Sequence, residues 1–117
     1  MFNYGGFMSE LNRQILNARK AIANIEKCEK MSDIFKVLGD AGRLKVVKAL
    51  SAGELCASDI ALALNIQNSV ASHQLKLLKQ SGIIAARKEG KFIYYKIENE
   101  CVRSLLELVD KHLLHCS

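Results

Sequence analysis

The spacing of apolar residues along the chain predicts a mainly helical protein. Over residues 9–27, apolar side chains recur at alternating steps of four and three, which is the period of one face of an α-helix: Leu11, Ile15, Ala18, Ile22 and Ile25. The same period predicts a second helix near residues 29–38. Two glycines then interrupt the pattern in "GDAG", and Asp40 is the expected N-cap of a third helix, "RLKVVKAL".

The second half of the chain predicts two short helices, a hairpin and a final helix. Within residues 57–80, "ASDIALAL" and "SVASHQLKLLKQ" have helical character and are separated by a tight turn at "NIQN". Residues 83–97 are rich in Ile, Phe and Tyr around Glu89-Gly90, which indicates a β-hairpin. The helical period returns over residues 99–116. The 117 residues fit a single, mainly α domain with a small β-hairpin.

The charge of the chain is concentrated in one segment. The formal net charge is +5, and residues 65–97 carry six basic side chains against Glu89 alone, while the rest of the chain has equal numbers of acidic and basic residues. A basic segment is often only a solvated face, but one that carries the whole excess charge favours a polyanionic partner.

Other features of the sequence limit the function classes. No apolar run reaches the roughly 18 residues of a membrane span, and residues 1–8 lack the pattern of a signal peptide, so we expect a cytoplasmic protein without a membrane partner. Four cysteines in such a chain are expected as thiols or metal ligands rather than disulfides. The chain has no Gly-rich phosphate loop or nucleophile elbow, which argues against an enzyme.

Two short helices joined by a tight turn and followed by a basic hairpin are the parts of a winged helix-turn-helix. The second helix would enter the major groove of DNA, where Gln and Asn can bind an adenine edge and Ser or His can bind bases or phosphates. Its first turns hold Gln67, Asn68, Ser69, Ser72, His73 and Gln74, with Lys76 near phosphates, and the hairpin adds Arg87, Lys88 and Lys91. The alternative is an ordinary amphipathic helix with His73 on its surface.

Three stretches, "VLGDAGRLKVVKAL", "ELCASDIALALNIQNSVASHQLKLLKQSGII" and "RKEGKFIYYKI", resemble the ArsR/SmtB family of metal-sensing transcriptional repressors. The resemblance covers roughly residues 31–116. It implies a homodimeric winged-helix repressor that binds double-stranded operator DNA and releases it when a metal ion binds. It also implies a dimer interface made by the first helix, residues 9–27, and the last, residues 99–116. Family members often carry "S.SAVSHQL" where this chain has "QNSVASHQL", so Val70 and Ala71 are exchanged.

The last helix carries candidate metal ligands on one sector of its helical wheel: Cys101, His112, His115 and Cys116. The first two lie eleven residues apart, or about 16 Å along the axis, too far for one metal ion to bridge within one chain. An antiparallel partner helix would place Cys101 of one chain beside His112 and His115 of the other. The alternative is that these residues only pack, because Cys is often buried and His is favoured near a helix C-terminus.

The family's pattern on the last helix implies Asn99, Cys101, His112 and His115 as the ligand set. Two residue types depart from it, because Asn99 replaces a carboxylate and Cys101 replaces an imidazole. Thiolate favours softer metals, so we expect a divalent ion, zinc first, with cadmium, lead or arsenite as alternatives. Cys116 could replace Asn99 as the fourth ligand.

The resemblance also implies a second site at Cys56 and Asp59, for which residues 1–27 supply no Cys or His and Cys28 is the nearest further candidate. Two alternative functions stay open. Cys28 could pair with Cys101 or Cys116 in a thiol-based, oxidant-responsive repressor. The protein could instead be a constitutive DNA-binding protein without a small ligand.

Overall fold

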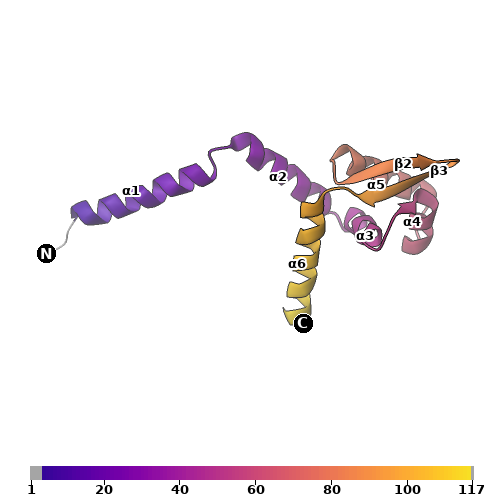
Figure 1. Cartoon of the computed structure of the whole chain (residues 1–117). Coiled ribbons are helices and arrows are strands. Elements are labelled where there is room, and N and C mark those ends of the chain that lie inside the picture. Colours follow the sequence, from indigo (N-terminus) through magenta and orange to yellow (C-terminus); the bar gives the residue numbers. More distant parts are fainter. Residues whose placement is uncertain (1–3, 117) are drawn as a thin grey trace. The chain divides into compact units, whose positions relative to one another are not determined.

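The computed structural model describes the backbone of residues 4–116 and the side chains of residues 9–114. The chain divides into two units, residues 1–32 and residues 33–117, which are described separately. The elements labelled in Figure 1 are α1 (Tyr4–Ala21), α2 (Ile25–Leu38), α3 (Ala41–Leu50), β1 (Leu55–Cys56), α4 (Ala57–Leu64), α5 (Asn68–Gln80), β2 (Ile84–Glu89), β3 (Phe92–Ile97) and α6 (Glu100–Cys116).

The first unit contains α1 and the beginning of α2, and it corrects the prediction of one helix over residues 9–27. The helix ends at Ala21, and α2 begins at Ile25 rather than near residue 29. The cause is Asn24, whose side-chain oxygen accepts a hydrogen bond of 2.8 Å from the backbone N–H of Lys27. Asparagine is a strong N-cap, so it starts a new helix although the apolar spacing continues in phase.

The core of the second unit lies among α3, α4, α5 and the hairpin. Its largest fully buried side chains come from all of these elements: Val46, Val47, Leu50, Ile60, Leu75, Leu78, Ile83 and Ile84. The C-terminal part of α2 adds Leu38 to this core. The predicted N-cap of α3 is confirmed, because Asp40 accepts a hydrogen bond of 3.0 Å from the backbone N–H of Arg43.

Helices α4 and α5 form the predicted helix-turn-helix. Asn65 ends α4 in the left-handed conformation, with φ of 54°, and its N–H bonds back to the carbonyls of the last turn. Asparagine tolerates this conformation better than most residues. Ala71 on α5 is completely buried, while the neighbouring Val70 is 42% exposed. The exchange of these two residues therefore places the smaller side chain in the core.

The hairpin belongs to a three-stranded antiparallel sheet in the order β1-β3-β2. Gly90 turns the hairpin with a φ of 60°, as expected. The register pairs Ile84 with Ile97 and Arg87 with Tyr94. Ile84 and Ile97 are buried against the core, whereas the side chains of alternate residues project from the opposite face. The strand β1 has only two residues and was not predicted, because two residues carry no periodic signal.

Helix α6 directly follows the hairpin (Figure 1). Asn99 caps it by accepting a hydrogen bond of 3.2 Å from the backbone N–H of Val102, which is buried in the core. Further along α6 the apolar side chains become exposed, with Leu108 at 66% and Leu113 at 58%. None of the helices in the described part of the chain is both long and apolar enough to cross a membrane.

Candidate nucleic-acid interface and metal ligands

Helix α5 has a buried apolar face and an exposed polar face. The packing of the buried face fixes the direction in which the polar face points. Ala71, Leu75 and Leu78 are at most 1% exposed, so the helix cannot rotate about its axis without exposing core residues. The opposite side carries the predicted DNA-contacting residues, all of them exposed: Gln67, Asn68, Ser69, Ser72, His73 and Lys76. This arrangement offers hydrogen-bond donors and acceptors on a rigid helix, as major-groove recognition requires.

Gln74 does not belong to this polar face, although its position in the sequence predicts that it would. Its side chain is half-buried and lies against the start of α3. A Cβ atom at Gly42 would come within 2.9 Å of the Nε2 atom of Gln74, so the glycine permits the close approach of the two helices. The Oε1 atom of Gln74 is buried without a hydrogen-bond partner among the described residues.

The hairpin carries three of the predicted DNA-contacting residues in two different environments. Lys88 and Lys91 are exposed near its tip. The guanidinium of Arg87 instead bonds within the protein, at 2.6 Å to the Oε2 atom of Glu89 and at 2.9 Å to the Oε2 atom of Glu54. These two hydrogen bonds, with Glu89 contributing most, raise the pKa of Arg87 above its already high value.

Arg87 also lies over the ring of Tyr94. The Cζ atom of Arg87 is 5.0 Å from the centroid of that ring. Two carboxylates and one aromatic ring therefore surround this side chain in the free protein. The cluster ties the hairpin to Glu54, which immediately precedes β1. A sequence pattern could not reveal this, because Glu54 lies 33 residues from Arg87.

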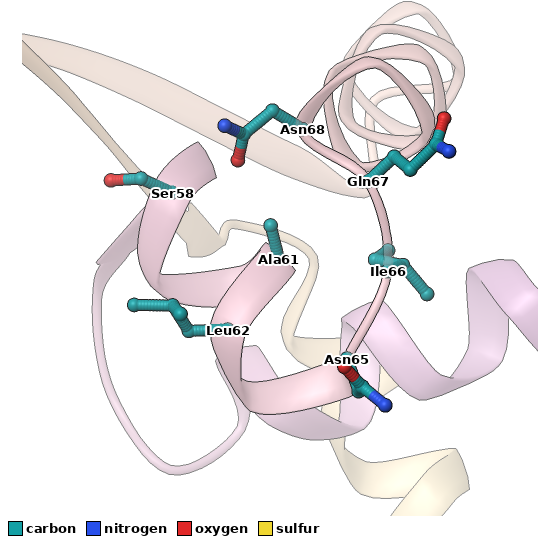
Figure 2. A pocket seen from close by; sticks show the side chains of 7 residues that line it. All are labelled: Ser58, Ala61, Leu62, Asn65, Ile66, Gln67 and Asn68. Atoms are coloured by element: carbon teal, nitrogen blue, oxygen red, sulfur yellow. The ribbon is translucent and has the colours of Figure 1, made fainter.

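Two hollows adjoin the helix-turn-helix. One of about 450 Å³ lies between α4 and the start of α5, and Figure 2 shows Ser58 and Asn68 on the same side of it, on facing elements. A second, of about 300 Å³, is lined by α4, by Ser72 of α5 and by the hairpin residues from Lys91 onwards. Ser58 lines both hollows. One serine at a helix start carries no specific signal for DNA binding in the sequence.

Cys56 and Asp59, the two residues of the possible second site, lie together at the start of α4. The thiol of Cys56 donates a hydrogen bond of 3.1 Å to the Oδ2 atom of Asp59, and the Oγ atom of Ser58 lies 3.1 Å from the same sulfur. Cys56 is only 7% exposed. Cys28, the third candidate, is an exposed residue of α2 in the first unit.

The candidate ligands of the last helix are only partly described by the structure. Cys101 and His112 are both exposed on α6. The side-chain oxygen of Asn99 is engaged as the cap of this helix. The side chains of His115 and Cys116 lie outside the described residues. Among the described side chains, no three Cys, His, Asp or Glu residues of the single chain come together in a way that could hold a metal ion.

Comparisons with known proteins agree with this architecture. Residues 40–86 match the family model described as bacterial regulatory protein, arsR family. The chain is 39% identical over 103 residues to a cadmium resistance transcriptional regulatory protein CadC homolog of Staphylococcus aureus, covering 87% of this chain and 82% of the relative. It is 30% identical over 100 residues to a transcriptional repressor SmtB homolog of Synechocystis, covering 86% of this chain and 76% of the relative.

A solved structure extends the agreement to three dimensions. The homodimeric winged helix-turn-helix DNA-binding domain of a possible ArsR-family regulator from Mycobacterium bovis superimposes with a TM-score of 0.70. It is 35% identical, and the match covers 83% of this chain and 90% of that one. The fold described above is thus a winged helix-turn-helix, and the chain belongs to the ArsR family of bacterial transcriptional regulators.

Proposed function

We propose that this protein is a repressor that binds operator DNA as a homodimer and releases it when a thiophilic or borderline metal ion binds. The observation that carries the DNA-binding part is the exposed polar row of α5, which is fixed by a fully buried opposite face and lies on a basic segment of the chain. In this proposal Gln67 and Asn68 read base edges, while Lys76, Lys88 and Lys91 bind phosphates.

The apolar surface of the helices supports a dimer. On α6, Leu108, Leu113 and Leu114 are 58–77% exposed, and on α1 Leu16 is 54% exposed. Large exposed apolar side chains are costly in water, and a domain of this size gains from burying them against a second copy. We therefore propose α1 and α6 as the dimerisation helices, with α4 and α5 reading DNA and the β2–β3 hairpin as the wing.

The donor set of α6 supports a metal as the inducer. A thiolate from Cys101 and an imidazole from His112 suit zinc, and the thiolate also suits cadmium and lead. The two residues are eleven positions apart on one helix, so a shared ion requires the antiparallel α6 of a second copy. Relatives named as cadmium resistance and arsenical resistance regulators support a metal or metalloid inducer in general.

The remaining ligands follow from the same arrangement. His115 is the third ligand, because it follows His112 by three residues on the same helix. If Asn99 bound a metal, it would lose the capping hydrogen bond from Val102, which stabilises the helix by about 1 kcal/mol. This cost favours Cys116 as the fourth ligand. Zinc is the first candidate ion.

The coupling between metal and DNA would act through the angle between the two subunits. Two recognition helices must enter successive major grooves about 34 Å apart. A metal bound across the two α6 helices favours one inter-subunit angle and thereby shifts the population away from the DNA-competent one. Such coupling free energies are typically about 1–3 kcal/mol.

A titration of operator release tests the proposal. Duplexes selected by the protein from a randomised pool provide the operator, and fluorescence anisotropy measures its affinity with and without zinc, cadmium, lead and arsenite. Release by at least one ion, with about one tight metal site per chain, is the expected result. Tight DNA binding that no ion changes would instead indicate a constitutive DNA-binding protein.

A second candidate inducer follows from the exposure of Cys28 and Cys101. Exposed thiols can be oxidised, so the same fold could respond to oxidants through a disulfide. Operator release by a mild oxidant, reversed by a thiol reductant and lost in Cys28→Ser, would favour this candidate over the metal.

A further inference from the structure

We propose that Ser58 and Lys91 together hold one phosphate of the DNA backbone in the hollow between α4, α5 and the hairpin. This inference rests on the proposed function, because it assigns a further contact to the same DNA-binding face. The proposed contact adds Ser58 to the DNA-binding face. It also distinguishes Lys91 from the other exposed cations, because Lys91 would share one phosphate with Ser58.

The position of the hollow is the first argument. It has a volume of about 300 Å³ and is lined by Ser58 of α4, Ser72 of α5 and Lys91 beside the hairpin turn, together with Cys56, Ala57, Phe92, Ile93 and Tyr95. The first three lie on three separate elements, two of which carry residues expected to contact DNA. Ser58 also lines the neighbouring hollow together with Asn68, at the start of the recognition helix (Figure 2). Ser58 therefore lies between the polar face of α5 and the β2–β3 hairpin.

The chemistry of the lining is the second argument. Two hydroxyl groups and one ammonium group can all donate hydrogen bonds to phosphate oxygens, and Lys91 adds the opposite charge. Residues 65–97, which include Ser72 and Lys91, carry six basic side chains against Glu89 alone, so this segment favours an anion. These three donors therefore suit a backbone phosphate, while Ala57, Phe92 and Ile93 form an apolar part of the lining beside them.

The present partner of Ser58 is a weak one. Its Oγ atom lies 3.1 Å from the sulfur of Cys56, and a thiol is a weak hydrogen-bond acceptor. The acidic residue beside it, Asp59, is already engaged by the thiol and by the backbone N–H of Cys56. A hydroxyl can rotate, so Ser58 can exchange the sulfur for a phosphate oxygen, which is a charged and therefore stronger acceptor.

The test uses the full-length protein and a random-sequence duplex, because a phosphate contact acts on all sequences alike. Ser58→Asp introduces a negative charge into the hollow and should weaken binding roughly a hundredfold through the lost hydrogen bond and the added repulsion. Ala63→Asp is the matched control, since Ala63 is exposed on the same helix and lines neither hollow. It should weaken binding far less.

A double-mutant cycle shows whether the two residues share one phosphate. Ser58→Ala should weaken binding roughly tenfold, and Lys91→Gln should lower the slope of log K against log salt by about 0.9. If both side chains hold the same phosphate, the double variant loses less affinity than the product of the two single losses. If Ser58→Asp fails to fold, the double-mutant cycle by itself decides whether Ser58 and Lys91 hold the same phosphate.

Two outcomes would overturn the site while leaving the proposed function standing. One is a double variant, Ser58→Ala with Lys91→Gln, whose loss of DNA affinity equals the product of the two single losses. The other is a folded Ser58→Asp protein that binds the duplex as tightly as Ala63→Asp. A wild-type protein that binds no duplex at all would overturn the proposed function and this site together.

Discussion

The side chain of Lys48 on α3 forms an ion pair with Asp110 on α6, 62 residues away in the sequence. Arg103 adds a hydrogen bond of 3.3 Å from its guanidinium to the backbone carbonyl of Ser51, at the end of α3. These polar contacts join the helix that carries the candidate metal ligands to a helix of the core that supports α5. They are therefore a physical connection between the proposed sensing helix and the proposed DNA-reading helix.

Removing the ion pair should reduce the coupling between metal and DNA by about as much as it reduces stability. Both side chains are about half exposed, so the pair contributes only about 0.2–1 kcal/mol to the free energy of unfolding. In Lys48→Gln we expect the metal-induced loss of operator affinity to shrink by a similar amount, because α6 can pivot more freely on α3. Operator anisotropy with and without zinc, together with thermal unfolding, measures both quantities.

Two further variants make this prediction specific. Lys30→Gln removes the lysine of an exposed ion pair within α2 and should leave the coupling unchanged. Reversing the charges with Lys48→Asp and Asp110→Lys should restore the coupling if the pair itself matters. A coupling that is equal in the wild type and in Lys48→Gln would show that this ion pair does not contribute to the coupling.

Replacing Gln74 should stabilise the protein without weakening DNA binding. The Oε1 atom of Gln74 is buried without a partner among the described residues, and an unsatisfied polar atom costs about 1–3 kcal/mol. Gln74→Met has a similar size and removes this atom, so we expect the free energy of unfolding to rise by about 1 kcal/mol. Chemical denaturation measures this change.

The same variant tests the orientation of α5 when compared with Gln67→Ala. Gln67 is exposed at the start of the helix, so Gln67→Ala should weaken binding to the selected operator more than binding to a random duplex. Gln74→Met should weaken neither. A strong loss of operator affinity in Gln74→Met would mean that Gln74 turns outwards when DNA binds.

Arg87 and Lys88 should differ in their contribution to DNA binding although they are adjacent. The guanidinium of Arg87 is held by Glu54 and Glu89, whereas Lys88 is exposed. Lys88→Gln should lower the slope of log K against log salt by about 0.9, and Arg87→Gln should lower it by less. Equal slopes for the two variants would indicate that Arg87 leaves its carboxylate partners for a phosphate.

The parts of the fold that the sequence predicted are those with a strong local signal. The helix-turn-helix and the hairpin each combine a clear period with a turn residue, Asn65 in one and Gly90 in the other. The break after Ala21 was missed because the apolar stripe continues in phase across it, and only the hydrogen bond of Asn24 reveals the new helix. Strand β1 exists only because β3 pairs with it.

The candidate site also has parts that the sequence predicts and parts that it does not. The exposed polar face of α5 follows from the helical period, which can be read directly from the sequence. The burial of Gln74 depends on Gly42, and the ion pairs of Arg87 depend on Glu54, so both require contacts between residues distant in the chain. The hollow beside Ser58 likewise depends on Lys91, which lies 33 residues further along the chain.

The candidate metal ligands can be tested by complementation between two variant chains. Neither Cys101→Ala nor His112→Ala should form an intact site as a homodimer, because each proposed site takes Cys101 from one chain and His112 from the other. A heterodimer of the two variants has one site in which both ligands are present. It should therefore recover about one tight metal ion per dimer, which equilibrium dialysis against zinc measures.

This experiment separates a site shared between chains from one contained in a single chain. Ligands from a single chain would leave both variant chains defective in the heterodimer, so no binding would be recovered. Homodimers of the variants that still bind zinc tightly and still release the operator would place the ligands elsewhere, and Cys56 with Asp59 would be the next pair to replace. Recovery in the heterodimer alone requires two α6 helices that lie antiparallel, since eleven residues of helix keep Cys101 and His112 about 16 Å apart within one chain.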